Sequence, residues 1–526
     1  MTNPISDFSL SEVILVIGSN TTEAHPIIGA RMRRAARAGA KLLVIEPRQI
    51  PLTRSAHLHL QHRPGTDVAL INGLMHVIIK EGLHDADYVE SRTEGFEELC
   101  EMVEKYDPKT VAGITGVTEE EIIAAARLYG SARPASIAYA MGITQHTTGT
   151  DNVKSLANLA MLCGNVGVPG GGVNPLRGQN NVQGACDLGA LPNVYPGYQK
   201  AADPVVREKF ERAWGIELPQ QPGLTITDIL PAALEGKVKA LYVMGENPML
   251  SDPDTTHVKQ ALEALDFLVV QDLFLTETAR LADVVLPASS FVERDGTVTN
   301  TERRIQKMNK VIEPLEGTRP DWQIICDLAT RMGYPMNYGS ASEIMEEVAE
   351  VTPQYGGISY ERLDAGEQLC WPCPAPDHPG TPILHVDKFS RGRGKFFAIE
   401  FLPADELPDK KYPMLLTTGR LLPQFHTGTM TRKSFGLNAL APGPFVQVNP
   451  DDARKMKIKH GETVEVSSRR GKIEVPVKVD EAIDRGVIFI PFHFAEAAAN
   501  MLTNPAHDPI AKIPEFKVCA ARIEKR

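Results

Sequence analysis

One arginine stands in a stretch of the chain that is otherwise rich in glycine and amide side chains. Residues 164–198 read GNVGVPGGGVNPLRGQNNVQGACDLGALPNVYPGY, and Arg177 is their only cation. A stretch with so little hydrophobic periodicity cannot form a core. A guanidinium offers a rigid fork of donors that matches a carboxylate. We interpret Arg177 as a binding group for a small carboxylate, while a flexible linker, a salt bridge and a phosphate contact remain alternatives.

Small and acidic residues follow two apolar runs near the start of the chain. Gly18 ends the run EVILVIG, and Glu46 follows the run KLLVI. Glycine lets the backbone approach a diphosphate, and the amides at the start of the following helix attract the anion. A carboxylate after the second strand accepts hydrogen bonds from a ribose or a base. The pattern is not a GxGxxG fingerprint, so a strand turn without a ligand stays open.

A similar combination recurs further along the chain. MGENP at 244–248 follows one apolar run, and Gln271 and Asp272 follow the next. Two edges of this kind favour a pair of nucleotides as the ligand, although turn chemistry alone also explains these residue types.

Polar residues also mark the ends of apolar runs in the last part of the chain. Thr418, Arg420, His426 and Lys517 are donors that could close over phosphates. A single histidine such as His426 is more often a satisfied core or surface residue.

The seven cysteines are scattered, and only Cys370 and Cys373 have CxxC spacing. One CxxC pair cannot complete a tetrahedral metal site. We interpret this pair as structural and the seven thiols as reduced.

The hydrophobic pattern around these residues indicates an α/β protein with several domains. Residues 1–178 give alternating strand and helix signals, including a helix capped by Thr118 with Glu121 three positions on. Short apolar runs of this kind suit a parallel sheet covered by helices on both faces. We interpret this region as one doubly wound, Rossmann-like domain.

The later regions of the chain have different residue patterns. Strand and helix signals recur over residues 179–340 and predict a second Rossmann-like domain. Residues 341–400 are rich in proline and glycine and are interpreted as a connector. From residue 401 the apolar period changes to two, with a turn at Arg470-Gly471, which predicts a compact β-barrel over residues 401–526.

Composition limits the possible partners. The 526 residues include 66 acidic and 55 basic side chains, for a formal charge of -11. This excess of negative charge disfavours nucleic acid and anionic membrane surfaces. A membrane span needs about 20 consecutive apolar residues, and no stretch approaches this length. The first residues lack a secretory signal. We expect a cytoplasmic protein without a membrane span.

Several motifs together resemble the catalytic subunit of molybdopterin-dependent formate dehydrogenases. RGQNNVQGACDLGALP at 177–192 is the most specific, and GSNTTEAHP, MGENP and PEFKVCAARIE resemble that family in the same order. The resemblance covers essentially the whole chain. It implies two Rossmann-like domains, a C-terminal double-psi-type β-barrel and two molybdopterin guanine dinucleotides that hold molybdenum or tungsten. The implied reaction is the oxidation of formate to CO2, or its reverse.

The resemblance also implies roles for individual residues. Arg177 would be catalytic, orienting formate beside the metal, and no residue of this chain would ligate the metal. The expected cofactor contacts are Gly18, Ser19, Asn20, Glu46, Pro47, Arg48, Gly65, Asp67, Gly142, Gln145, Gly178, Gln179, Gly245, Glu246, Asn247, Gln271, Asp272, Thr276, Thr418, Gly419, Arg420, His426, Thr427, Asn504 and Lys517.

The chain also departs from the family that it resembles. Those proteins begin with a cysteine-ligated 4Fe-4S domain, followed by a Cys or selenocysteine that ligates the metal, whereas the first cysteine here is Cys100. We therefore expect a missing N-terminal segment and no activity from this chain alone. One hypothesis for the start at Met1 is that an upstream selenocysteine codon was read as a stop, so that the sequence begins at the next methionine. The missing segment and electron-transfer subunits are the expected partners.

Two other functions remain open. One is a cofactor-binding or structural subunit of a redox complex, as in the large subunit of complex I. The other is a molybdopterin oxidoreductase for a different oxyanion, such as nitrate. Arg177 favours an enzyme, because a structural subunit has no need of a cation that binds formate.

Overall fold

The structure is a computed structural model that describes residues 1–525. The chain forms two compact units. Unit one contains residues 1–176, 249–258 and everything described from Ile383 onward, and unit two contains residues 177–248 and 259–382. The chain leaves unit one close to the predicted boundary at residue 178. It returns within the segment that was predicted as a connector.

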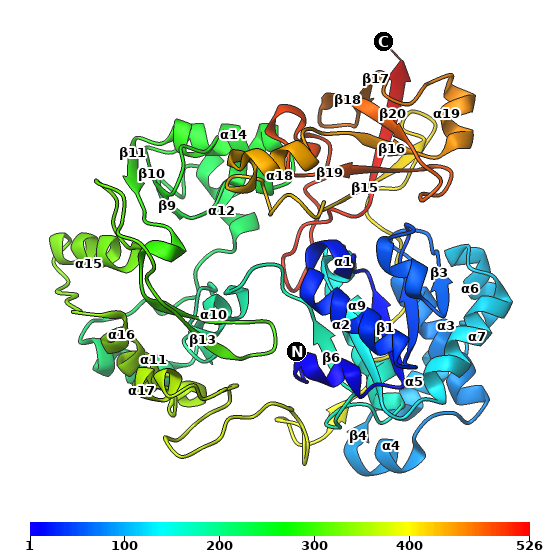
Figure 1. Cartoon of the computed structure of the whole chain (residues 1–526), viewed down its shortest axis with the longest axis horizontal. Coiled ribbons are helices and arrows are strands. Elements are labelled where there is room, and N and C mark those ends of the chain that lie inside the picture. Colours follow the sequence, from blue (N-terminus) through cyan, green and yellow to red (C-terminus); the bar gives the residue numbers. More distant parts are fainter. Residues whose placement is uncertain (526) are drawn as a thin grey trace. The chain divides into compact units, whose positions relative to one another are not determined.

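A five-stranded parallel sheet forms the centre of the N-terminal part of unit one (Figure 1). All neighbouring strands are parallel, in the order β3-β2-β1-β5-β6. Every residue of β1 and β5 is buried, which explains why their sequences are apolar runs without alternation. The strands are β1 (Val13–Ile17), β2 (Lys41–Ile45), β3 (Leu58–Leu60), β5 (Ala135–Tyr139) and β6 (Val173–Pro175).

Helices cover both faces of this sheet. Leu15 and Ile17 pack with residues of α3, α7 and α9, whereas Ile14 and Val16 pack with residues of α2. This two-sided cover confirms the predicted doubly wound arrangement. The helices are α1 (Thr21–Ala24), α2 (Pro26–Arg37), α3 (Asp67–Lys80), α4 (Ala86–Arg92), α5 (Phe96–Val103), α6 (Pro108–Thr115), α7 (Glu119–Gly130), α8 (Met141–Thr144) and α9 (Gly149–Leu162).

A closed barrel of six strands forms the C-terminal part of unit one, in the order β15-β19-β16-β18-β17-β20. Two of its strand pairs, β15 with β19 and β16 with β18, are parallel, and the others are antiparallel. Side chains alternate between buried and exposed along β18, as the period of two predicts. The strands are β15 (Met414–Gly419), β16 (Val446–Val448), β17 (Thr463–Ser467), β18 (Lys472–Val479), β19 (Val487–Pro491) and β20 (Cys519–Lys525).

The barrel also confirms a local prediction. Ser467 pairs with Lys472, so the chain turns where Arg470-Gly471 was predicted to make a turn. The short helix α19 (Pro450–Met456) begins where Asn449 caps it through the backbone N–H of Asp451. The other helix between the barrel strands is α18 (Phe435–Leu440).

Acidic side chains of the last loop hold that loop on helix α9. Asp508 accepts hydrogen bonds from the backbone N–H of Thr150 at 2.9 Å and from its hydroxyl at 2.8 Å. Glu515 accepts one from the backbone N–H of Thr147 at 3.2 Å. The N-terminus of α9 is thus satisfied by carboxylates of the protein itself.

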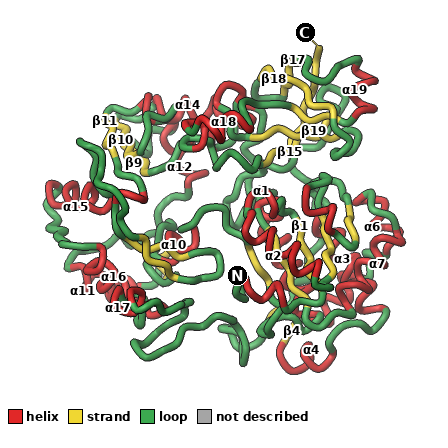
Figure 2. The backbone as a smooth tube through the Cα atoms, viewed as in Figure 1, coloured by secondary structure: helices red, strands yellow, loops and turns green. Residues whose placement is uncertain are grey.

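Unit two contains a second parallel sheet, of three strands in the order β11-β10-β9, and long stretches of loop (Figure 2). The strands are β9 (Ala240–Met244), β10 (Phe267–Asp272) and β11 (Val284–Pro287). Apolar side chains of the outer strands, including Tyr242, Met244 and Val284, remain exposed. The sheet occupies the predicted place but has fewer strands than the first one.

The remaining elements of unit two are short. Its helices are α10 (Val182–Asp187), α11 (Pro204–Trp214), α12 (Ile226–Leu234), α15 (Asp321–Arg331), α16 (Ala341–Val351) and α17 (Tyr360–Asp364). The short α13 (Pro248–Ser251) and α14 (Thr255–Glu263) lie where the chain passes between the units. Its other strands are β7 (Val194–Tyr195), β8 (Gln199–Lys200), β12 (Gly296–Thr299) and β13 (Ile305–Met308).

The first part of the predicted connector, residues 341–382, is folded. Met345, Tyr355, Leu369 and Cys373 pack with Ile305 in a core of their own. Proline and glycine interrupt the pattern often enough to hide these short helices from a reading of periodicity. All seven cysteines, including the CxxC pair, are free thiols. Within residues 1–525, no helix is both long and apolar enough to cross a membrane.

Candidate functional site

Two glycines meet where the order of the first sheet reverses, between β1 and β5. Gly18 directly follows β1, has a φ of +56° and accepts a hydrogen bond from the backbone N–H of Gly142 at 2.9 Å. A Cβ atom on Gly142 would lie 2.5 Å from the Gly18 carbonyl oxygen. Backbone at such a switch point, bare of side chains, is where open α/β sheets bind dinucleotides.

Residues beside these glycines are mostly held by the protein. The hydroxyls of Ser19 and Thr21 lie 2.9 Å apart and are buried. Asn20 accepts a hydrogen bond at 3.3 Å from the hydroxyl of Thr22. Gln145 follows α8 and is half-buried. At this edge of the sheet, the predicted contacts therefore offer backbone groups, more than side chains, to a ligand.

Glu46, after β2, is half-buried. Its carboxylate makes no hydrogen bond or ion pair to any of residues 1–525. Burial raises its pKa, although Arg48, His62 and Lys517 act in the opposite direction. A half-buried carboxylate without a protein donor can accept hydrogen bonds from a ligand, so Glu46 fits a ligand hydroxyl or amine.

Arg48 links the first sheet to the barrel. Its guanidinium lies 3.5 Å from the ring centroid of Phe489 on β19 and donates to the side chain of Gln447 on β16 at 3.2 Å. Stacking and hydrogen bonding together fix the direction of the fork. The predicted contacts of the first sheet and those of the barrel therefore share one region of unit one.

Lys517 and Arg420 bring positive charge to the same region from the barrel. The ammonium of Lys517 donates to the Thr418 carbonyl at 2.8 Å. Burial and the nearby Arg420 lower the pKa of Lys517 to about 7. Within residues 1–525, Arg420 has no hydrogen bond or ion pair, and its guanidinium lies 5.9 Å from the ring centroid of Phe492. Arg420, a cation without an acceptor among these residues, and the nearby ammonium of Lys517 together fit a diphosphate.

Two histidines on the barrel side of this region are neutral. Burial lowers the pKa values of His426 and His493 to about 4, with Arg420 acting in the same direction. His493 accepts from the backbone N–H of Leu421 at 2.8 Å, and its other ring nitrogen lies against the carbonyl of His426. These bonds favour a neutral ring with its proton on Nδ1. Sequence reasoning missed His493, which carries no motif.

The other predicted residues of this part are polar or lie at turns. Thr427 shares a hydrogen bond of 3.0 Å with Thr429, and Asn504 donates to the Val518 carbonyl at 3.2 Å. Gly419 lies against the Phe489 ring, which a Cβ atom would approach to 2.7 Å. The side chains of Thr427 and Asn504 therefore stabilise the loops and do not indicate a ligand.

Asp67 belongs to a buried ion pair that the sequence analysis did not predict. Its carboxylate lies 3.1 Å from His62 and 3.9 Å from His146. Although burial alone would lower it, Asp67 raises the pKa of His62, and His62 in turn holds the pKa of Asp67 below its usual value. His146 also contacts the Gly142 carbonyl at 2.8 Å, so the pair is connected to the switch point.

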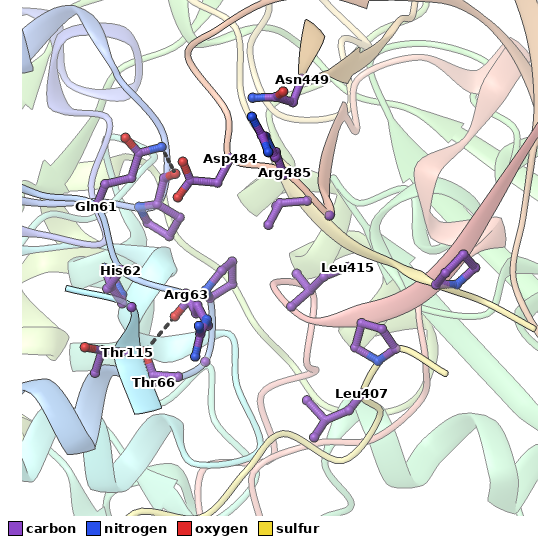
Figure 3. A pocket seen from close by; sticks show the side chains of 18 of the residues that line it. Gln61, His62, Arg63, Thr66, Thr115, Leu407, Leu415, Asn449, Asp484 and Arg485 are labelled. Carbon is purple, nitrogen blue, oxygen red and sulfur yellow. Dashed lines mark hydrogen bonds between the residues drawn. The ribbon is translucent and has the colours of Figure 1, made fainter. Parts of the chain in front are cut away.

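A cavity of about 1310 Å³ opens beside this region. Figure 3 shows Gln61, His62 and Arg63 on the side of the sheet, with Leu415 and Arg485 on the side of the barrel. The predicted residues Pro47 and Gly65 also line it. Its volume is large enough for a nucleotide. The residues that line this cavity do not include Gly18, Glu46, Arg48, Arg420 or Lys517, so the cavity adjoins the predicted contacts through Pro47 and does not contain them.

The second sheet presents its predicted residues differently. Gly245 has a φ of +64° with no atom within 4 Å of a Cβ built on it, and Glu246 is exposed. Asn247 binds Thr278 and Glu277, and Gln271 binds Tyr242 and Asp321. Backbone at Gly245 is therefore open, while the two amide side chains hold unit two together.

Asp272 and Thr276 lie just after the same strand. Asp272 accepts a hydrogen bond from the backbone N–H of Leu273 at 2.6 Å, and burial raises its pKa. Thr276 accepts one from the backbone N–H of Ala279 at 3.1 Å. Both side chains form turns, the alternative that the sequence left open.

Arg177 begins unit two, directly after the first sheet ends. Its backbone N–H donates to Thr301 at 3.1 Å. Its Nε donates to the Gln183 side-chain oxygen at 3.0 Å, and Nη1 lies 3.6 Å from the Cys186 sulfur. Gly178 and Gln179 follow, both half-buried. The guanidinium is thus held on one edge by helix α10, which excludes a flexible linker.

Gln183 connects Arg177 to a buried carboxylate. Gln183 donates to Asp187 at 2.7 Å, and Asp187 also accepts from the hydroxyls of Tyr198 and Tyr355, each at 2.8 Å. Burial raises the pKa of Asp187, although these donors act in the opposite direction. None of these four residues was predicted as part of the site, because the resemblance pointed only to the arginine and its immediate neighbours.

Residues 1–331 match the family model "Molybdopterin oxidoreductase", and residues 414–520 match the model of the molybdopterin dinucleotide binding domain. The chain belongs to the molybdopterin oxidoreductase family. This confirms the family that the motifs indicated, and it identifies the barrel as a domain that binds a molybdopterin dinucleotide.

Similar molybdopterin oxidoreductases include formate dehydrogenases. The chain is 53% identical to F420-dependent formate dehydrogenase 1 subunit alpha of Methanococcus maripaludis, covering 100% of this chain and 78% of the relative. It is 42% identical to formate dehydrogenase H of Escherichia coli, covering 100% and 74%. The assimilatory nitrate reductase catalytic subunit of Bacillus subtilis is 39% identical, covering 99% and 76%.

A solved structure supports the fold of this molybdopterin oxidoreductase. Acetylene hydratase from Pelobacter acetylenicus superposes with a TM-score of 0.79 at 24% identity, over 98% of this chain and 78% of that one. At this identity the likeness concerns the fold alone.

Proposed function

We propose that this chain is the catalytic alpha subunit of a formate dehydrogenase, which oxidises formate to CO2 or catalyses the reverse reaction. The observation that carries the proposal is Arg177, a guanidinium held by Gln183 at the start of the motif RGQNNVQGACD. A small carboxylate is the ligand that such a fork recognises best. Relatives named as a formate dehydrogenase alpha subunit and as formate dehydrogenase H, 53% and 42% identical, support the same substrate.

The proposed cofactor is molybdenum or tungsten held by two molybdopterin guanine dinucleotides. Gly18, Glu46, Arg48, Arg420 and Lys517 would hold one dinucleotide, since they supply bare backbone, an acceptor for hydroxyls and cations for a diphosphate. The open backbone at Gly245 supports the second, in unit two. When bound, this cofactor accepts the two electrons and the hydrogen of formate.

The chain itself contributes binding and orientation. Formate, HCOO⁻, yields CO2, one proton and two electrons. Arg177 would bind both carboxylate oxygens, which leaves the C–H bond directed away from the guanidinium. The product CO2 is neutral, so the ion pair that holds formate is lost on oxidation. Arg177 thus favours binding of the substrate and release of the product.

The electrons would leave through a partner subunit, and the names of the relatives support F420 as a final acceptor. The proposed enzyme also contains a 4Fe-4S cluster, which residues outside this sequence would bind. We also propose that the complex works in the cytoplasm.

Nitrate is the second candidate substrate. The nitrate reductase of Bacillus subtilis is 39% identical over nearly the whole chain. Nitrate is also a planar oxyanion, so an arginine fork does not by itself exclude it.

Dye assays on the native holoenzyme that contains this chain distinguish these functions. We expect formate-dependent reduction of a viologen dye and no nitrate-dependent oxidation of reduced viologen. Nitrate turnover without formate turnover would replace the proposal with the second candidate. A complex that binds molybdopterin yet neither oxidises formate nor reduces nitrate would identify a structural subunit. Metal analysis of the same sample measures molybdenum and tungsten.

A further inference from the structure

Helix α10 carries two buried polar side chains one turn apart. Gln183 and Asp187 are separated by four residues, which places both on the same face of the helix. The side-chain nitrogen of Gln183 donates to Asp187 at 2.7 Å, and its oxygen accepts from Arg177 at 3.0 Å. One amide therefore bridges a carboxylate and a guanidinium.

This arrangement permits only one orientation of the Gln183 amide. The Asp187 carboxylate is an acceptor, and the Arg177 guanidinium is only a donor. The amide nitrogen must therefore face Asp187, and the oxygen must face Arg177. A reversed amide would place two donors against each other at Arg177.

Asp187 is itself held in place from two directions. Tyr198 donates to one of its carboxylate oxygens and Tyr355 donates to the other, each at 2.8 Å. Tyr355 also shares a hydrogen bond of 2.7 Å with Thr299 on β12. Asp187 is 1% exposed and Tyr355 is 2% exposed, so water competes little for these bonds.

We propose that Gln183 and Asp187 are positioning residues for substrate binding, and that Tyr198 and Tyr355 hold Asp187 for this task. The inference rests on the proposed function of Arg177 as the formate-binding cation. Asp187 fixes the amide of Gln183, and Gln183 fixes the Nε edge of the guanidinium. The plane of the guanidinium, and with it the direction in which it presents donors to a carboxylate, is set by helix α10.

The chemistry of the residues separates this role from a purely structural one. A buried carboxylate that accepts three hydrogen bonds contributes to stability wherever it lies. Here one of its three donors is the amide that contacts Arg177, so a change at Asp187 alters the orientation of the guanidinium. The affinity for the substrate should therefore fall when the Gln183 amide no longer bridges Asp187 and Arg177, even if the fold is intact.

The test uses Gln183→Met and Asp187→Asn in the native holoenzyme. Gln183→Met keeps the size of the side chain and removes the bridge. Asp187→Asn removes the obligate acceptor, so the Gln183 amide can reverse. We expect each variant to raise KM for formate about tenfold with a smaller change in kcat, because binding to Arg177 is weakened in ground and transition states alike.

Inhibition by azide provides a second measurement. Azide is a linear anion of similar size with no C–H bond to oxidise, so its inhibition constant should rise by the same factor as KM. A change in stability alone would alter the amount of active enzyme, and neither KM nor the inhibition constant. Tyr198→Phe, which removes one of the donors to Asp187, should give a smaller shift in the same direction.

A matched control is available in the same unit. The Tyr360 hydroxyl is buried without a hydrogen-bond partner among the described residues, and Tyr360→Phe should leave KM and azide inhibition unchanged. Arg177→Lys is measured alongside. If Arg177→Lys keeps the wild-type KM, the proposed role of Arg177 fails. If Arg177→Lys raises KM while Gln183→Met, Asp187→Asn and Tyr198→Phe all stay within twofold of wild type, only the positioning inference fails.

Discussion

Gly142 lies against Gly18 so closely that a Cβ atom on Gly142 would come within 2.5 Å of the Gly18 carbonyl oxygen. The contact brings the segments after β1 and β5 together at the switch point of the first sheet. No side chain fits there without moving backbone, and a moved backbone would no longer offer the same surface to a diphosphate.

Gly142→Ala should therefore destabilise unit one by about 1–3 kcal/mol and lower the amount of bound cofactor. Chemical denaturation and metal content measure the two effects. Gly113→Ala is the control, because it lies in helix α6 with open space around its Cβ position, and alanine should stabilise that helix slightly. Equal effects of the two substitutions would contradict the argument from close contact.

Lys517 should make the binding of diphosphates depend on pH. Its pKa is lowered to about 7 in the absence of a ligand, from an ordinary value of 10.5. Above pH 7 the free protein holds a neutral lysine, so binding an anion requires the uptake of a proton. The affinity of the cofactor-free protein for GDP should fall as the pH rises from 7 to 9, by up to about tenfold per pH unit.

Calorimetry of GDP binding across this pH range gives the profile. Lys517→Met should bind weakly at every pH and lose the dependence that comes from this residue. Lys517→Arg stays charged and should bind with a flatter profile than wild type. A wild-type affinity that is constant between pH 7 and 9 would show that Lys517 does not face the phosphates.

Glu406 and Arg470 form a bidentate ion pair near the end of the barrel, with contacts of 2.6 and 2.8 Å. Although burial alone would raise it, Arg470 holds the pKa of Glu406 below its ordinary value of 4.5. The stabilisation is therefore complete above pH 4.5 and is lost as the pH falls through the lowered pKa. Glu406→Gln should cost about 1–3 kcal/mol at pH 7 and much less at pH 3.

Glu400→Gln is the matched control for this pair. Glu400 binds Lys105 at the surface, where both side chains are more than half exposed, and its loss should leave the unfolding midpoint unchanged. Urea unfolding at the two pH values measures both variants. The prediction fails if Glu406→Gln is as stable as Glu400→Gln at pH 7.

Asp508 should matter for the attachment of the last loop. Its carboxylate accepts from the backbone N–H and the hydroxyl of Thr150 at the start of α9, and from two backbone N–H groups of its own loop. Asp508→Ala should cost about 1–2 kcal/mol, as the loss of a helix cap does. Faster hydrogen exchange at the start of α9 should accompany it, and unchanged exchange there would contradict the cap.

Much of the fold could be predicted because local signals and packing agree. The strands at 13–17 and 41–45 appear where apolar runs predicted them, and α7 begins with the capping box of Thr118 and Glu121. Residues 341–382 were harder, since helices of 5 to 11 residues, separated by loops that contain proline and glycine, leave no clear period.

The candidate site was predictable only in part. Glu46, Arg48 and Lys517 were expected contacts, and all three lie in one region of unit one. His62 and Asp187 escaped notice, because a buried ionisable side chain is recognised by the partners that folding brings to it. Asn247 and Gln271, expected at a cofactor, have partners within unit two that the sequence could not reveal.

The most direct test of the central claim is the steady-state oxidation of formate by holoenzyme that carries Arg177→Ala. Loss of a charge-assisted bidentate contact should lower kcat/KM by about 100-fold with metal content unchanged. Added guanidinium chloride should restore part of the activity by occupying the space of the side chain. Wild-type kcat/KM in the Arg177→Ala enzyme would contradict the claim that this guanidinium binds formate.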